Sequence, residues 1–449
     1  MARTIAIIGG GIAGLSASYY LKKSGVTHTV FEESSQIGGV IRSQTIDGFT
    51  IENGPNTILL SDQRTLEMFN DLGLKIEEAS PKSKNRYIVK NKECIPVPTS
   101  FYSFIKSPLF NISTKLKILT EAFRRNEPNR DEESVSQFII RRFNKQILDY
   151  AINPFIAGTY AGDPDSLSIE HSFPLLYKTE KKYGSIIGGF INKRRHIEPN
   201  KIKRKTVSFI GGISELTKKM SQFSEDSISY QSQIYDITKT GDGYTLRFMR
   251  NGNDESFFCN DIISTIPTHA LKNITINGDI YPDFEELQKI NYPPVVSLSL
   301  GFKSEHISHS LEGFGALVPK CEKMNILGVL FSSSLFKNRS PKGYSLLTVF
   351  MGGSRQPKLT KLSNTERVDL AIADLKILLG VSAKPSFIQQ TLWEKSIPQY
   401  HVGYGHYRSI INMVEAKLPN FYFAGNYLNG ISIQDTIISS MNLINKRIG

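Results

Sequence analysis

Residues 4–14 read TIAIIGGGIAG, an apolar run that meets a Gly-x-Gly-x-x-Gly turn directly, and a helical pattern follows. A second apolar run, Thr29–Phe31, ends on Glu32. Strand, glycine turn, helix and terminal acid appear in this order within about thirty residues, which is the layout of a dinucleotide-binding unit. The glycines permit a tight turn, a close approach of the backbone to a pyrophosphate, and close packing of helix on strand. The helix N-terminus favours phosphate, and Glu32 is placed to accept hydrogen bonds from a ribose.

Two further features favour FAD over NAD as the dinucleotide. Glycines recur at Gln36–Gly39 and in Glu52–Pro55, where they let the backbone run along a long ligand. Near the other end of the chain, Phe421–Tyr427 reads as a strand with a glycine turn, and Ser432-x-x-Asp435 resembles a capping box that starts a helix. The N-terminus of that helix could face the pyrimidine end of a flavin and stabilise negative charge there. Taken without the N-terminal turn, the same residues would indicate plain helix capping.

Length and composition set the class of protein. A chain of 449 residues is expected to form two or three domains. No uninterrupted apolar run approaches the ~18–20 residues of a membrane span, and the first strand begins too early for a signal peptide. Cys94, Cys259 and Cys321 are isolated, which favours a reducing cytoplasmic setting and argues against a metal site or a disulfide. We find no hydrolase triad, P-loop or internal repeat.

The net charge of +12 is concentrated in one part of the chain. Residues 96–205 hold 19 Lys/Arg and 11 Asp/Glu, with the densest basic run at 193–205. The same part is rich in large apolar side chains, among them Phe101, Tyr102, Ile105 and Phe123. Apolar residues beside basic ones suit an anionic membrane surface better than nucleic acid. An ordinary core helix with a solvated basic face explains the pattern equally well, and both interpretations stay open here.

The order of expected elements predicts an α/β protein with a discontinuous, Rossmann-type nucleotide-binding domain. We expect short strands at 86–90 and 94–98, helices over 99–202, a strand at 206–210, an antiparallel pair at 233–237 and 244–248, a buried strand at 261–267, strands at 295–302 and 344–351, and a helix over 366–379. The predicted domains are a nucleotide-binding domain (1–77, 203–272 and 396–449), a mixed-sheet substrate domain (78–95 and 273–395) and a helical, membrane-associating domain (96–202). A second Gly-x-Gly-x-x-Gly is absent, which disfavours reductases that bind both FAD and NAD(P)H.

Several stretches carry a family resemblance. Ile8–Gly14 and Glu32–Gly39 are typical of a whole flavoprotein superfamily, and Asn153–Ser168, Trp393–Tyr400 and Gly425–Asp435 are more specific. With these stretches the chain resembles the FAD-dependent protoporphyrinogen oxidases, within the amine oxidase and phytoene desaturase superfamily, over nearly its full length. The resemblance implies a p-hydroxybenzoate hydroxylase-like FAD-binding domain and non-covalent FAD. Peripheral attachment to the inner face of the cell membrane, from the cytoplasm, is a separate expectation that rests on the basic and apolar residues of 96–205. A homodimer is a further expectation.

The resemblance also implies which residues contact FAD. The pattern ordinarily has a basic residue directly after Gly38 and Gly39, but this chain has Val40 there and Arg42 two residues on, which puts a salt bridge at position 40 in doubt. The predicted FAD contacts are Gly9, Gly10, Gly11, Ile12, Ala13, Gly14, Glu32, Glu33, Gly38, Gly39, Arg42, Gly54, Pro55, Asn56, Thr57, Ile234 (at the adenine end), Gly425, Asn426, Ile431, Ser432 and Ile433.

Arg86 is the residue that the resemblance assigns to substrate. It resembles the arginine that pairs with a porphyrinogen propionate in the protoporphyrinogen-specific members, and a guanidinium can grip a carboxylate through two parallel hydrogen bonds. The related coproporphyrinogen oxidases commonly lack an arginine at this place. Without the resemblance, an arginine at the start of a strand would indicate a surface residue. Arg86 therefore favours protoporphyrinogen over coproporphyrinogen.

The activity implied is oxidation of protoporphyrinogen IX to protoporphyrin IX in heme biosynthesis. It would remove six electrons in three hydride transfers to FAD, with molecular oxygen reduced to peroxide. No side chain stands out as a catalytic base, so none is predicted. Alternatives are a coproporphyrinogen III oxidase and a flavin amine oxidase. Amine oxidases with covalent flavin use a cysteine near the C-terminal motif, and this sequence has none after Cys321. A non-enzymatic alternative, the Rab-escort type of binding protein, lacks the tail around Ser432.

Overall fold

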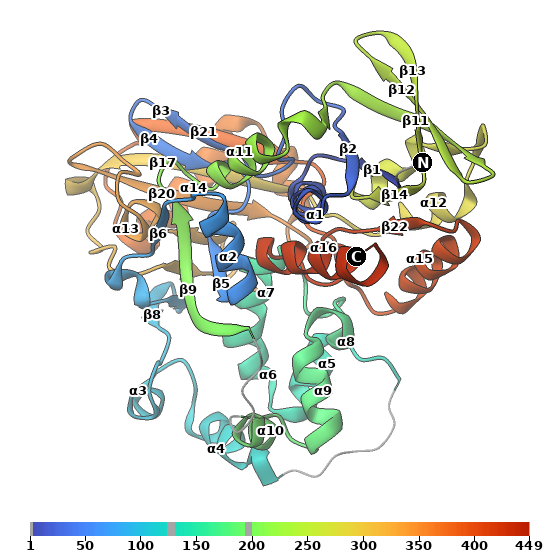
Figure 1. The fold of residues 1–449 in the computed structure, drawn as a ribbon. Coiled ribbons are helices and arrows are strands. Elements are labelled where there is room, and N and C mark those ends of the chain that lie inside the picture. The colour runs from blue at the N-terminus through green and yellow to red at the C-terminus, as the bar shows by residue number, and fades with distance from the viewer. Residues whose placement is uncertain (1–2, 124–130, 194–199, 449) are drawn as a thin grey trace.

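The computed structural model describes residues 3–123, 131–193 and 200–448 (Figure 1). A parallel sheet forms its nucleotide-binding part, in the order β10 (Ile228–Ser229), β2 (Thr27–Phe31), β1 (Thr4–Ile8), β14 (Asp261–Ser264) and β22 (Phe421–Phe423). Its strands come from each of the three segments predicted for the nucleotide-binding domain. The central strand β1 is buried on both faces, which explains its unbroken apolar sequence. The mixed α/β class is therefore confirmed, whereas the p-hydroxybenzoate hydroxylase-like subtype stays a prediction.

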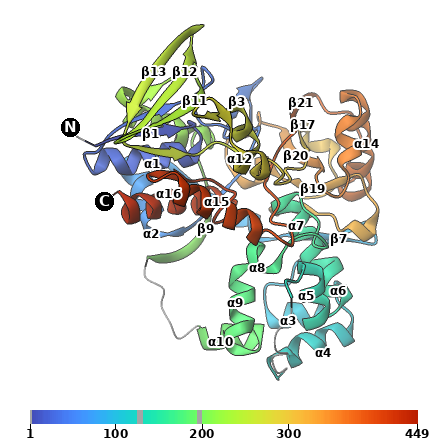
Figure 2. The same cartoon turned by 90° about the vertical axis from the view of Figure 1, so that its right-hand side faces the viewer.

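Helices cover this sheet. α1 (Ile12–Lys23) follows β1 and packs beside α16 (Ile433–Arg447), and the Ser440 hydroxyl donates to the Ala13 carbonyl across the two helices at 3.0 Å. α11 (Ser214–Phe223) also contacts α1, and α15 (Gly405–Lys417) precedes β22. Two segments 420 residues apart in sequence are therefore packed into one layer, as the α1 and α16 labels show in Figures 1 and 2.

A mixed sheet forms the second body, in the order β21 (Phe387–Trp393), β17 (Val295–Lys303), β20 (Tyr344–Gly352), β19 (Ile326–Leu330), β18 (Gly315–Leu317), β7 (Tyr87–Lys90) and β8 (Glu93–Pro96). β7 pairs in parallel with β18, so the early segment around residue 87 joins strands from the second half of the chain. The helix α14 (Asn364–Leu379) packs against this sheet through Ala371, Leu375 and Leu379 (Figure 2).

Three smaller sheets of the described chain complete the part of the molecule that lies above the helical segment in Figure 1. They are β13–β12–β11–β15–β16 (Asn253–Cys259, Gly243–Arg250, Ser232–Thr240, Thr275–Ile276 and Asp279–Ile280), β5–β9–β6 (Ile58–Asp62, Lys201–Phe209 and Ile76–Glu78) and the hairpin β3–β4 (Ser43–Ile46 and Phe49–Glu52). The remaining helices there are α2 (Gln63–Asp71), α12 (Pro282–Leu287) and α13 (Ser332–Leu335). Short 3₁₀ turns span Pro81–Lys84, Glu121–Phe123, Glu225–Ser227, Thr268–Asn273, Ser304–His306, Lys320–Glu322 and Pro357–Lys361.

Most of the helical segment projects away from the sheets, toward the bottom of Figure 1, while its helix α7 packs against β18 and β19. It comprises α3 (Phe101–Lys106), α4 (Ile112–Thr120), α5 (Val135–Arg142), α6 (Lys145–Ile147), a π-turn (Leu148–Ile152), α7 (Asn153–Tyr160), α8 (Ile169–Ser172), α9 (Pro174–Tyr183) and α10 (Ile186–Lys193). Within the described chain, no helix combines the length and the apolar character that crossing a bilayer requires.

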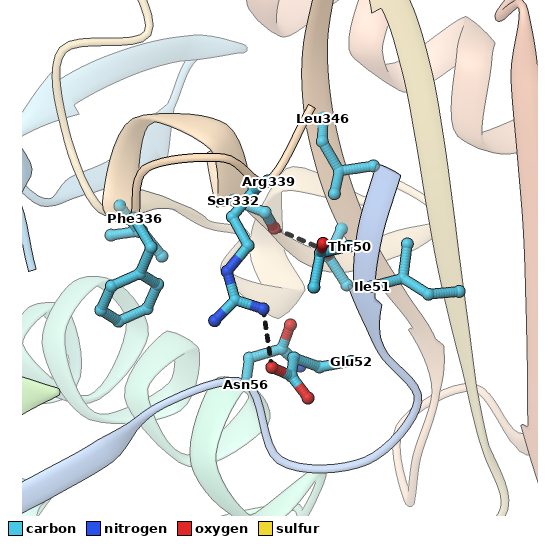
Figure 3. Close-up of a pocket in the computed structure, with 10 residues that line it drawn as sticks. Thr50, Ile51, Glu52, Asn56, Ser332, Phe336, Arg339 and Leu346 are labelled. Carbon is cyan, nitrogen blue, oxygen red and sulfur yellow. Dashed lines mark hydrogen bonds and ion pairs between the residues drawn. The ribbon is translucent and has the colours of Figure 1, made fainter. Parts of the chain in front are cut away.

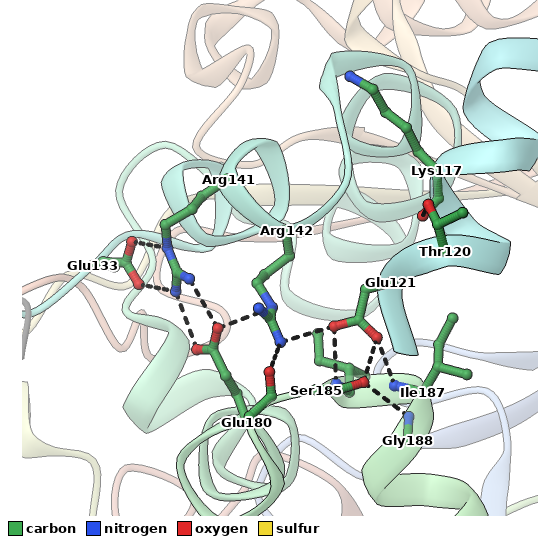
Figure 4. Close-up of polar contacts among 12 residues, drawn as sticks. Lys117, Thr120, Glu121, Glu133, Arg141, Arg142, Glu180, Ser185, Ile187 and Gly188 are labelled. Carbon is green, nitrogen blue, oxygen red and sulfur yellow. Dashed lines mark hydrogen bonds and ion pairs between the residues drawn. The ribbon is translucent and has the colours of Figure 1, made fainter. Parts of the chain in front are cut away.

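Buried charges tie these helices together (Figure 4). Arg142 and Glu121, which expose 2% and 0% of their surface, pair at 2.9 Å. Glu180 forms ion pairs with both Arg142 and Arg141, at 2.9 and 2.8 Å. Glu121 also accepts the backbone N–H groups at the start of α10, and Arg141 reaches Glu133. Each buried charge thus meets an opposite charge, which offsets the cost of removing it from water. The network fixes α5, α9 and α10 relative to one another.

Most predicted elements match the structure, including the antiparallel pairing of β11 with β12. Two predicted strands differ in length. The strand predicted at 206–210 is longer, because β9 begins at Lys201, within the stretch predicted to be helical up to 202, where Lys201 pairs with Asp62 of β5. The strand predicted over 261–267 is shorter, because β14 ends at Ser264. Thr265 turns its hydroxyl back to the carbonyls of Ile8 and Gly9, at 2.9 Å each. The end of the strand is therefore diverted to support the glycine turn.

Candidate cofactor and substrate site

The glycine turn has the shape that a dinucleotide requires. Gly9 adopts φ +104°, and a Cβ at Gly14 would lie 2.0 Å from the Gly9 carbonyl oxygen, so only glycine fits at either place. Gly11 differs from both, because a Cβ there would meet nothing within 4 Å. Gly11 also begins α1 without any side-chain cap. The start of α1, with Ile12 and Ala13, therefore faces open space with N–H groups suited to an anion.

The carboxylate of Glu32 is fixed beside this turn. One oxygen accepts from the Gly10 N–H at 2.8 Å, and the other accepts from the N–H and the hydroxyl of Ser34, at 3.0 and 2.8 Å. The start of β11 meets the same residue, since the Ser232 N–H donates to the Glu32 carbonyl. This contact brings β11, with the buried Ile234, to the end of β2 where an adenosine is expected. Glu33, in contrast, is exposed and no contact fixes it among the described residues.

A second glycine pair lies against the first. The Gly38 N–H donates to the Gly10 carbonyl at 2.8 Å, and a Cβ at Gly39 would lie 3.3 Å from the Gly11 Cα. Arg42 reaches back to the Gly39 carbonyl through its Nε at 3.1 Å. Arg42 thus lies beside the second glycine pair, and its contact with FAD stays a prediction.

The end of β4 continues the lining. A Cβ at Gly54 would lie 2.0 Å from the Val40 carbonyl oxygen, the Asn56 amide donates to the Gly54 carbonyl at 3.0 Å, and the Trp393 indole donates to the Asn53 carbonyl at 2.6 Å. These contacts fix a loop that includes the half-buried Pro55 and Thr57, which are also predicted FAD contacts. The loop's own Asn56 and the Trp393 side chain of β21 thus fix one stretch of backbone.

Glu52, at the start of this loop, anchors it to the rest of the protein (Figure 3). It pairs with Arg339 at 2.8 Å, and both side chains are almost fully buried. Glu52 also accepts from the Ile213 N–H and the Ser43 hydroxyl, and Arg339 donates to the Ser208 hydroxyl. Burial raises the pKa of Glu52, while the charge of Arg339 opposes that shift. A small cavity lined by Asn56, Glu52 and Arg339 lies directly beneath the loop.

The C-terminal segment supplies the other wall. Ser432 caps α16, accepting from the Asp435 N–H at 3.1 Å and donating to its carboxylate at 2.6 Å. Ile433 is buried against the core around α1, and Ile431 packs between two clusters. The loop of Gly425 and Asn426 follows β22 at the same edge of the parallel sheet as the turn after β1. Ligands of such sheets bind at the carboxyl ends of the strands.

Arg86 lies on the mixed sheet, directly before β7. Its guanidinium lies over the Phe314 ring, 4.7 Å from the ring centroid, and its backbone carbonyl accepts from the Val97 N–H. No carboxylate pairs with Arg86 among the residues that the structure describes. Although the residue is exposed, the protein around its guanidinium displaces water and lowers its pKa, and the charge of Arg204 acts in the same direction. The guanidinium is therefore free to take an anion.

The helix of the Asn153–Ser168 stretch packs next to this position. Asn153 accepts from the Lys320 N–H and from Arg355, and a Cβ at Gly158 would lie 2.5 Å from the Leu317 side chain. Leu317 belongs to β18, the strand beside β7. The structure thus brings the helical stretch and Arg86 to neighbouring strands of one sheet.

Some residues of the site were not predicted. Gln434 accepts the N–H groups of Ser61 and Asp62 and so ties α16 to β5, and Arg339 anchors Glu52. Arg339 stands in no motif, and its partner is 287 residues away in sequence. Only the tertiary contact identifies it.

The residues present fit FAD. Open space beside Gly11 and the uncapped start of α1 provide room and N–H donors for a pyrophosphate, and the fixed carboxylate of Glu32 provides an acceptor for a ribose.

Comparison with known proteins gives the family. Residues 12–442 match the family described as flavin containing amine oxidoreductase. The chain belongs to this family. A relative from Nicotiana tabacum, named mitochondrial protoporphyrinogen oxidase, is 34% identical, with 98% of this chain and 94% of that protein covered. A relative from Bacillus subtilis, named coproporphyrinogen III oxidase, is 26% identical, with 96% and 95% covered.

A solved structure agrees with the family assignment. The crystal structure of an Exiguobacterium protein assigned as a protoporphyrinogen oxidase matches with a TM-score of 0.79 at 21% identity, over 99% of this chain and 98% of that chain. This similarity shows a shared fold. The resemblance stated from the sequence is confirmed, and the protein is an FAD-dependent oxidoreductase.

Proposed function

We propose that this FAD-dependent oxidoreductase converts protoporphyrinogen IX to protoporphyrin IX in heme biosynthesis. Relatives named protoporphyrinogen oxidase, at up to 34% identity over nearly the whole chain, support the proposal. The structural observation that carries it is Arg86, an arginine without a carboxylate partner in the described chain, held over Phe314 beside the helical stretch. A guanidinium in that state suits a propionate.

FAD is proposed to lie along the two glycine turns. When bound, it would supply two-electron oxidation, with molecular oxygen as the proposed acceptor. In this arrangement Glu32 would hold the ribose and the start of α1 the pyrophosphate. The loop after Glu52 and the start of α16 would orient the ring end, and Arg86 would orient the substrate by one carboxylate. A homodimeric assembly stays a prediction.

The substrate choice is tested by comparing the two porphyrinogens. For the wild type we expect higher kcat/KM with protoporphyrinogen IX than with coproporphyrinogen III. Arg86→Ala should lower kcat/KM for protoporphyrinogen by about 10- to 100-fold, mostly through KM, because a charge-assisted hydrogen bond to the substrate is lost. Arg86→Lys should recover part of this loss because it keeps the charge.

The exposed Arg247→Ala, on the β11–β12 hairpin, serves as the control and should behave as wild type. If Arg86→Ala leaves kcat/KM unchanged for both substrates, Arg86 is not the propionate anchor. If the FAD-loaded wild type oxidises neither porphyrinogen, the proposed function is wrong. Faster turnover of coproporphyrinogen III would instead support the activity for which the Bacillus subtilis relative is named.

We also propose that the far end of the helical segment attaches to an anionic membrane on its cytoplasmic face. Large apolar side chains on α3 and α4, and at Phe123, stand exposed, with Phe123 at 85% and Ile112 at 76%. Lys106 and Lys117 lie on the same two helices. Both views place these helices at the end remote from the sheets. The basic residues Arg194, Arg195 and His196, part of the predicted basic run, lie outside the described residues.

Liposome flotation tests this attachment. The wild type should float with vesicles containing anionic lipid, and less so at high salt or with neutral lipid. Ile112→Ser combined with Leu116→Ser should weaken binding about 10-fold, because two exposed apolar side chains no longer enter the interface. Ile280→Ser, which alters an equally exposed side chain on the small β16 strand, should leave flotation unchanged. Absence of flotation under every condition would contradict the proposal.

A further inference from the structure

The loop between β22 and α16 is held by a row of side chains from the segment before β22. The Tyr400 hydroxyl donates to the Asn426 carbonyl, and the Tyr404 hydroxyl donates to the Tyr427 carbonyl at 2.7 Å. Arg408 donates in turn to the Leu428 carbonyl. Three residues spaced four apart thus bind three successive carbonyls. We call Tyr400, Tyr404 and Arg408 the carbonyl clamp.

The two tyrosines are built into the core. Tyr400 and Tyr404 each expose 1% of their surface, and their ring centroids are 4.7 Å apart. The Tyr400 hydroxyl also accepts the Gly430 N–H at 3.3 Å, so a single oxygen bridges the two ends of the loop. Because this hydroxyl donates to one end of the loop and accepts from the other, it fixes both the distance between Asn426 and Gly430 and the orientation of the Asn426 carbonyl.

The clamp determines where the loop presents its N–H groups. The C=O and the following N–H of a trans peptide point in opposite directions, and the described chain contains no cis peptide. Carbonyls turned toward the clamp therefore turn the N–H groups of Tyr427 and Asn429 away from it. The loop follows β22 at the strand ends where the glycine turn follows β1. An anionic cofactor at that edge would meet N–H dipoles instead of carbonyl oxygens.

The main chain of the clamp is fixed from the helical segment. The Ser168 N–H donates to the Tyr400 carbonyl at 2.8 Å, and Leu167 and His401 form an isolated β-bridge. The clamp thus begins where the Asn153–Ser168 stretch meets the nucleotide-binding part. Contacts within the protein therefore define the position of the clamp.

We propose that Tyr400, Tyr404 and Arg408 are positioning residues for FAD, acting through the orientation of the loop over residues 425–430. The inference rests on the proposed placement of FAD along this edge and adds residues that no motif for FAD contact includes. It requires that the FAD affinity and the midpoint potential of the flavin depend on the side chains of the carbonyl clamp, which act through the loop.

The test is titration of apoprotein with FAD, followed by flavin fluorescence, together with the midpoint potential of the bound flavin. Tyr400→Phe and Tyr404→Phe should each raise the FAD dissociation constant about 10-fold, because each leaves a buried carbonyl free to rotate toward the cofactor. The midpoint potential should also shift from the wild-type value. Arg408→Met should also raise the FAD dissociation constant. Because Arg408 is only half-buried, this variant tests the proposal if a tyrosine variant fails to fold.

Tyr244→Phe is the matched control. Tyr244 is equally buried, and its hydroxyl donates to the Pro419 carbonyl at 2.6 Å, at the opposite end of β22. It should lose similar thermal stability yet keep wild-type FAD affinity and potential. Wild-type FAD affinity in the clamp variants, or an equal loss in Tyr244→Phe, would overturn the proposal. Gly11→Ala separates the two assumptions: if it weakens FAD binding while the clamp variants do not, only the clamp is wrong.

Discussion

Gly14→Ala is expected to destabilise the apoprotein by about 3 kcal/mol or more, whereas Gly11→Ala should leave it intact and weaken FAD binding instead. A Cβ at Gly14 would lie 2.0 Å from the backbone oxygen of Gly9, and backbone on both sides of the contact cannot yield without separating α1 from β1. A Cβ at Gly11 meets nothing within 4 Å, and its φ of −73° suits any residue. Substitution of two glycines in one motif should therefore change different quantities, the stability of the apoprotein for Gly14 and the affinity for FAD for Gly11.

Thermal unfolding of the apoprotein and FAD titration measure the two effects separately. For Gly11→Ala we expect an unfolding free energy within about 1 kcal/mol of wild type and an FAD dissociation constant about 10- to 100-fold higher, because the methyl group enters the proposed path of the pyrophosphate. Gly241→Ala, at an open hairpin turn away from the sheet edge, should change neither. Wild-type FAD affinity in Gly11→Ala would show that the pyrophosphate does not pass there.

Arg339→Met is expected to lower the free energy of unfolding by about 3–5 kcal/mol, because it leaves the buried carboxylate of Glu52 without its opposite charge. Combining it with Glu52→Gln should recover much of the loss, since the double variant buries no unpaired charge. Urea unfolding followed by fluorescence of Trp393, the chain's one tryptophan, suits this test. The Trp393 indole donates to the Asn53 carbonyl, one residue from Glu52, so its signal reports on the same loop.

Arg247→Met provides the comparison. Its ion pair with Asp254 is exposed, and the expected loss is below about 1 kcal/mol. If Arg339→Met lowers the free energy of unfolding by as little as Arg247→Met does, the Glu52–Arg339 pair does not hold the loop. A double variant no more stable than the single one would mean that the cost comes from lost packing around Arg339 rather than from the unpaired charge.

Local signals predicted a large part of the nucleotide-binding site. The glycine turn, Glu32 and Ser432 could be placed because each depends on neighbours within a few residues: a positive φ, a strand end or a helix cap. The length of β14 was predicted wrongly, because the contacts of Thr265 with Ile8 and Gly9 bridge more than 250 positions. The sequence pattern has a basic residue at position 40, where this chain has Val40. Only the structure shows that the Arg42 side chain reaches back to the Gly39 carbonyl.

The sequence by itself determined a glycine turn between the first strand and its helix, in a conformation suited to a dinucleotide, because backbone conformation and helix capping are decided over short distances. The segment around Ser432 favoured FAD as the dinucleotide, and the resemblance to a known family added the proposed substrate class. Only the tertiary structure decided how the loops are held. The pairing of Glu52 with Arg339, the stacking of Arg86 on Phe314 and the carbonyl clamp on the loop before α16 join segments up to 287 residues apart. Such contacts leave no local pattern, because burial and charge pairing depend on which surfaces the fold brings together.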